Sequence, residues 1–93
     1  MPMTTKLDST AIEARMASRY RESGLPCEIE AGPLGLVVYA LNRFNAEAIA
    51  KDILRQVRER DPRAIASKPM HDMDEPAATS WWAAVEFDWR RFG

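Results

Sequence analysis

The six residues from Leu36 to Leu41 (LVVYAL) form an apolar run without a single polar position. Side chains of a β-strand alternate between the two faces of its sheet, so a strand of this composition is apolar on both faces. We therefore expect a strand over residues 36–41 that is buried on both sides. A small chain must cover both faces of such a strand itself, or leave one face for contact with another molecule.

The segment just before this run, residues 27–31 (CEIEA), alternates strictly between small or apolar side chains and glutamates. This pattern predicts a half-exposed strand with Cys27 on its inner face. Gly32, Pro33 and Gly35 predict a turn between the two segments. We expect a hairpin whose first strand lies at the sheet edge, because its glutamates discourage further pairing.

The last predicted strand, residues 81–89 (WWAAVEFDW), has the strongest alternation in the chain. One phase is almost entirely apolar, whereas the other ends in two acidic residues. The inward phase is Trp81, Ala83, Val85, Phe87 and Trp89, and the outward phase is Trp82, Ala84, Glu86 and Asp88.

Two helices are expected. Thr10 and Glu13 fit a capping box for a helix over residues 9–23, which Gly24 ends in a Schellman motif. Asn45 is the predicted N-cap of a second helix that ends near Arg60, ahead of a proline. Each helix has one apolar stripe, so each can cover one surface of a sheet.

The resulting order is α-β-β-α-β-β within a single small domain over residues 1–93, with a weakly alternating strand at 63–68. We expect an α+β two-layer sandwich, in which two helices pack on one face of a four-stranded, mainly antiparallel sheet. Residues 1–8 are expected to be a flexible N-terminal segment, and residues 69–80 a long loop.

Two helices on one face leave the other face of the sheet uncovered. Val37, Tyr39, Leu41 and Trp82 lie on that outward side if Leu36 points inward. Tyrosine and tryptophan are enriched at the energetic centres of protein interfaces, so these four residues are the candidate partner-binding site. The alternative is that the 69–80 loop or the terminal segment 90–92 folds over this face.

Charge gives a second candidate function. The chain has 13 basic and 14 acidic residues, so any nucleic-acid contact must be local. A basic face on the second helix that continues past its end could contact phosphates, although acidic residues lie between its members: Lys51, Arg55, Arg58 and Arg63. This alternative is a nucleic-acid-associated protein.

Catalytic motifs are missing from the sequence. Cys27 and His71 are the only thiol and imidazole, and no spacing brings them together. His71 begins an acidic stretch through Glu75 that matches no standard metal-binding loop. We therefore expect no enzymatic activity, no metal and no cofactor.

The combined expectation is a non-enzymatic protein-interaction module, a small inhibitor or accessory protein. Only three of the 13 basic residues are lysine, a bias that favours a GC-rich bacterial or phage genome. The small size, the near-neutral charge and the missing catalytic groups fit a phage or mobile-element accessory protein. One cysteine and no apolar segment of membrane-spanning length favour the cytoplasm and exclude membrane insertion. We expect docking on a protein partner or on itself, as a homodimer.

Overall fold

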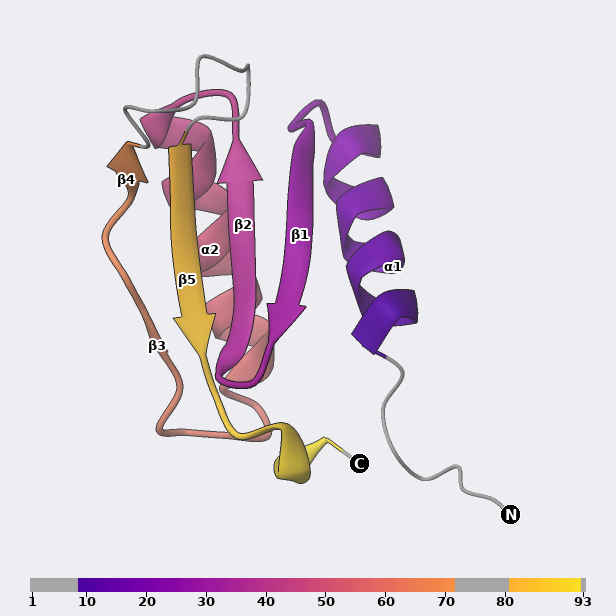
Figure 1. The fold of residues 1–93 in the computed structure, drawn as a ribbon, viewed down its shortest axis with the longest axis vertical. Helices are drawn as coiled ribbons and strands as arrows, with labels where there is room; N and C mark the ends of the chain where they lie inside the picture. The colour runs from indigo at the N-terminus through magenta and orange to yellow at the C-terminus, as the bar shows by residue number, and fades with distance from the viewer. Residues whose placement is uncertain (1–8, 72–80, 93) are drawn as a thin grey trace.

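The computed structural model of this chain describes residues 9–71 and 81–92, and the predicted N-terminal segment 1–8 lies outside this part. Figure 1 shows one sheet with two helices beside it. The elements are α1 (Ser9–Glu22), β1 (Cys27–Gly32), β2 (Gly35–Ala40), α2 (Arg43–Val57), β3 (Ile65–Ala66), β4 (Met70–His71), β5 (Trp81–Glu86) and the 3-10 helix η1 (Trp89–Arg91).

The strands form one antiparallel sheet in the order β1-β2-β5-β3, and β4 also pairs with β5. Because β2 occupies one side of β5, β3 and β4 share the other side, and the sheet is four strand positions wide. The predicted α+β class with an antiparallel sheet is confirmed, as are the hairpin and the edge position of its first strand.

The prediction of an unbroken loop over residues 69–80 was wrong at its start. Met70 and His71 form β4 and pair with Trp82 and Trp81. Two residues after a proline are too few to show alternation, so only the neighbouring strand reveals this pairing. Residues 72–80 lie outside the described part of the chain.

Helix α2 covers one face of the sheet, behind β2 and β5 in Figure 1. Its buried side chains are Ala46, Ile49, Ala50, Ile53 and Val57. They form the core with the inward residues of β2 and β5, which are Leu36, Val38, Ala40, Ala83 and Val85.

The N-cap of α2 differs from the prediction. Asn42 is the cap, and its side chain accepts a hydrogen bond from the Asn45 backbone N–H at 2.8 Å. Helix α2 therefore begins at Arg43 instead of after Asn45. Both asparagines are good caps, but Asn42 has the extended backbone of a cap residue, with a φ of −151°, whereas Asn45 already lies within the helix.

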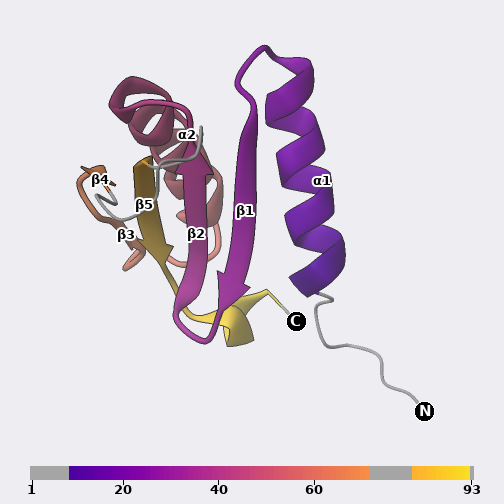
Figure 2. The same cartoon turned by 45° about the horizontal axis from the view of Figure 1, so that its top comes forward.

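Helix α1 runs beside β1 at the edge of the sheet, as Figures 1 and 2 both show. The predicted Schellman ending is confirmed: the Leu25 N–H donates to the Tyr20 carbonyl at 2.8 Å, and Gly24 has a φ of 81°. The Tyr20 hydroxyl donates to Asp52 of α2, and Arg19 donates to Gln56 at 3.0 Å. These two contacts tie α1 to α2 and bring the Tyr20 ring into the core.

The last strand ends at Glu86, three residues earlier than predicted. The Asp88 carboxylate accepts from the Arg90 backbone N–H at 3.0 Å and caps η1, which turns the chain away from the sheet. Phe87 and Trp89 still point into the apolar interior, where their rings meet edge to face at 4.7 Å. The alternation was therefore genuine as a burial pattern, but it extended beyond the strand.

Candidate functional site

The outer face is the side of the sheet that points away from α2, toward the viewer in Figure 1. In the β2–β5 register Tyr39 lies opposite Trp82, and Val37 lies opposite Ala84. Side chains directly opposite in an antiparallel pair lie on the same face and in contact range. The structure thus brings three of the four predicted partner-binding residues together, and the fourth, Leu41, follows β2 directly and is 43% exposed.

The outer face is wider than the sequence predicted. Met70 lies opposite Trp82 and is 51% exposed, and Ile65 lies opposite Glu86 and is 55% exposed. Both belong to two-residue strands whose register shows only in the folded sheet. They extend the apolar surface from β2 across β5 to the far edge.

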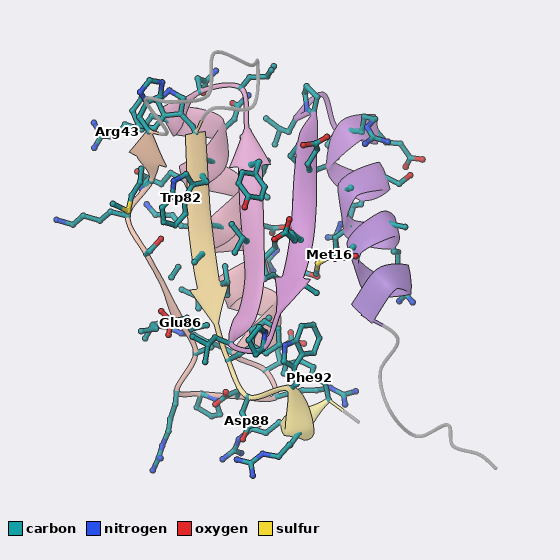
Figure 3. The ribbon with its side chains drawn as sticks, in the orientation of Figure 1. Met16, Arg43, Trp82, Glu86, Asp88 and Phe92 are labelled. Atoms are coloured by element: carbon teal, nitrogen blue, oxygen red, sulfur yellow. The ribbon has the colours of Figure 1, made fainter. Side chains whose placement is uncertain are left out.

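Carboxylates flank this apolar surface along β1 and at the end of β5. Glu28 lies opposite Tyr39 and Glu30 opposite Val37 on β1, and Glu86 lies near the end of β5; all three are exposed. Figure 3 shows Trp82 and Glu86 near the two ends of β5. Among the outward positions of the described strands, none carries a basic side chain.

A shallow hollow continues the face between β1 and α1. Glu28, Glu30 and Tyr39 line its sheet side, and Glu13 and Arg21 contribute from α1. Glu13 accepts a hydrogen bond from the Ala31 backbone N–H at 2.7 Å, so it also covers part of the β1 edge. Helix α1 therefore borders the outer face without lying across it.

The alternative prediction was that the terminal segment 90–92 or the 69–80 loop folds over the outer face. The terminal segment does not lie on it: Phe92 packs against the core with Phe87, at a ring distance of 5.0 Å, on the side that faces the helices. For the 69–80 loop, Met70 and His71 lie at the far edge of the sheet as β4. The rest of that alternative falls on residues outside the described part.

The basic residues proposed for nucleic-acid binding make contacts within the chain. Lys51 pairs with Glu47 at 3.0 Å, and Arg55 pairs with Asp52. The Arg58 Nε donates to the Ala64 carbonyl at 3.1 Å and closes the turn after α2. Exposed pairs of this kind add little stability, but they reduce the positive charge available to a phosphate backbone.

Arg63, the fourth proposed contact, lies in the turn that Asp61 organises. Asp61 is only 4% exposed, and its carboxylate accepts from the backbone N–H groups of Arg63 at 3.1 Å and Asp88 at 2.9 Å. Arg91 lies 3.7 Å from the same carboxylate. Asp61 thus joins the turn after α2 to the segment after β5, a structural role that its sequence position did not suggest.

Cys27 and His71 do not meet. Cys27 is buried on β1, and burial raises the pKa of its thiol. His71 is on β4, three strand positions away, with its ring 4.8 Å from that of Trp81. Within residues 9–71 and 81–92, no three His, Cys, Asp or Glu side chains are grouped so that they could hold a metal ion.

No family model, curated protein or solved structure matches this chain. None of the helices described here has both the length and the apolar character needed to cross a membrane.

Proposed function

We propose that this chain is a non-enzymatic interaction module, a small inhibitor or accessory protein of a bacterial or phage cytoplasm, that docks through its outer face. The observation that carries the proposal is the cross-strand pair of Tyr39 and Trp82, on a face over which neither α1 nor α2 packs. Large aromatic side chains with one apolar and one polar end are the residue types that dominate interface energetics.

The rest of the outer face supports this role. Apolar side chains extend in both directions from the aromatic pair, to Val37 and Leu41 along β2 and to Met70 across β5. A contiguous apolar surface rimmed by polar residues is typical of protein–protein contact sites. Burial of Tyr39 and Trp82 by a partner would remove apolar area at the centre of such a site.

The charge of the rim favours a basic partner over a second copy of this chain. In a homodimer formed through this face, the Glu28, Glu30 and Glu86 carboxylates of one copy would approach a face that carries the same three carboxylates. A partner with lysine or arginine side chains around an apolar centre would complement them instead. We therefore propose a heteromeric complex and expect the isolated chain to be monomeric.

The test begins with light scattering of the isolated chain and affinity capture from the source cell. The proposal requires that Trp82→Ser abolish capture of the partner and that Glu30→Lys weaken it. Phe44→Ser is the matched control, because Phe44 is 80% exposed on α2, the helix on the other side of the sheet from the outer face. Equal capture by all variants would contradict the proposal, and a dimer of the isolated chain would contradict the proposed heteromeric complex.

A further inference from the structure

A pocket of about 250 Å³ lies on the opposite side of the molecule from the outer face. It opens between α1 and α2 above the segment that follows β5. Six of its lining side chains are apolar and come from four separate parts of the chain: Met16, Leu36, Val57, Phe87, Trp89 and Phe92. Figure 3 shows Met16 extending from α1 toward the sheet, and Phe92 near the lower end of the sheet.

Contacts of the lining side chains with one another and with the rest of the chain fix the shape of the pocket. The Trp89 indole N–H donates to the Gly32 carbonyl at 2.7 Å, and Phe87 is clamped edge to face between Trp89 and Phe92. The Arg60 guanidinium lies 5.9 Å from the centre of the Phe92 ring. The aromatic wall is thus fixed in the chain itself, as expected for a largely pre-formed ligand site.

The polar lining is cationic. Arg15 and Arg19 of α1 and Gln56 of α2 complete the pocket, and no carboxylate belongs to the lining found in the described residues. Arg19 donates to Gln56 at 3.0 Å. Arg15 makes no hydrogen bond or ion pair with another residue in the described part of the chain. A guanidinium beside an apolar pocket favours a ligand that carries an anionic group next to an apolar chain.

We propose that this pocket binds a small anionic amphiphile, with its chain against Leu36, Val57 and Trp89 and its anionic head at Arg15 and Arg19. The volume is slightly below the range of about 300–1,000 Å³ that is typical for drug-sized ligands, which limits the chain to about eight carbons. A carboxylate and a phosphate monoester share the required head-group chemistry. This inference does not depend on the outer face or on the proposed interaction partner.

The test is a titration of the full chain with octanoate, followed by the NMR signal of the Trp89 indole N–H and by calorimetry. We expect saturable shifts of that signal with a dissociation constant on the order of 0.1–1 mM. Octyl phosphate should bind in the same range. Octanol and octylammonium should bind at least tenfold more weakly, because they lack the anionic head.

Arg15→Gln should weaken octanoate binding about tenfold or more without changing the unfolding midpoint, because Arg15 makes no hydrogen bond or ion pair with another described residue. Arg21→Gln is the matched control on the same helix, and it should bind like the wild type. The proposal is overturned if the Trp89 signal does not saturate by 10 mM octanoate, on the order of ten times the weakest expected constant. It is also overturned if octanol binds as tightly as octanoate, or if Arg21→Gln weakens binding as much as Arg15→Gln.

Discussion

Replacement of Gly35 by alanine should be the most disruptive single-methyl change in the sheet. Gly35 begins β2 opposite Glu86 of β5 and has a φ of 147°. An added Cβ would lie 2.0 Å from the Val85 carbonyl oxygen, whereas real Cβ contacts essentially never fall below 3.0 Å. Strands β2 and β5 would have to move apart by about 1 Å at this end to relieve the clash.

The cost has two parts. A non-glycine residue in this backbone region costs about 1–3 kcal/mol, and loss of two neighbouring ladder hydrogen bonds costs about 1 kcal/mol each. The sum is about 3–5 kcal/mol, which is a large share of the 5–14 kcal/mol expected for a domain of about this length. The β2–β5 register also places Tyr39 beside Trp82, so the same change disturbs the outer face.

Urea unfolding followed by tryptophan fluorescence measures this effect. The Gly35→Ala midpoint should fall by about 1.5–5 M, given a slope of about 1–2 kcal/mol/M for a small domain. Gly32→Ala is the matched control in the same turn, since no atom lies within 4 Å of its added Cβ, and its midpoint should be unchanged or slightly higher. Equal midpoints for the two variants would refute this account of the β2–β5 contact.

Three further predictions concern buried polar groups. Asp61→Ala should lower the free energy of unfolding by about 2–4 kcal/mol in the same assay, because it leaves two backbone N–H groups without their acceptor. Glu59→Ala, in the exposed turn after α2, is the control and should change the free energy of unfolding by less than about 0.5 kcal/mol. Burial, with a further contribution from Asp52, raises the pKa of the Tyr20 hydroxyl above its usual value near 10. The unfolded state therefore loses this proton first, so wild-type stability relative to Tyr20→Phe should be constant below about pH 10 and fall above it; a constant difference across this range would contradict the assignment. Buried Cys27 should react with a thiol reagent only at the rate of opening or unfolding, and rapid labelling of the native chain would show that β1 is accessible.

Local patterns in the sequence were sufficient to predict most of the fold. Alternation at 27–31 and the apolar run at 36–41 predicted the hairpin, because a strand that must bury one face shows its period directly. The Gly24 ending of α1 was equally local, since only the residues of one turn take part. These features needed no knowledge of distant partners.

The features that were missed depend on contacts between distant parts of the chain. The pairing of β4 comes from β5, ten or more residues later. The link between α1 and α2 depends on Tyr20 reaching Asp52, 32 residues along the chain. The role of Asp61 requires the segment after β5 to return to the turn after α2. Alternation through Trp89 predicted a strand that is three residues too long, because Phe87 and Trp89 continue to point inward after β5 has ended.

In the candidate site, too, local patterns were predictable from the sequence, and contacts between distant segments were not. The outward phase of β2 and β5 was readable from the sequence, and the structure places Val37, Tyr39 and Trp82 on one face. Met70 and Ile65 could not be added before the register of β3 and β4 was known. The pocket was not predictable from any single segment, because its lining comes from α1, β2, α2 and the residues after β5.

The central claim is that the Tyr39–Trp82 face is a docking surface, and the affinity of Trp82→Ser for the captured partner tests it most directly. The account predicts that the dissociation constant rises by about thirtyfold or more, which corresponds to a loss of about 2 kcal/mol of binding free energy. It also predicts that the free energy of unfolding of the isolated chain falls by about 1 kcal/mol or less. An unchanged dissociation constant, together with a loss of stability of about 3 kcal/mol or more, would contradict it. That result would mean that Trp82 packs within its own chain.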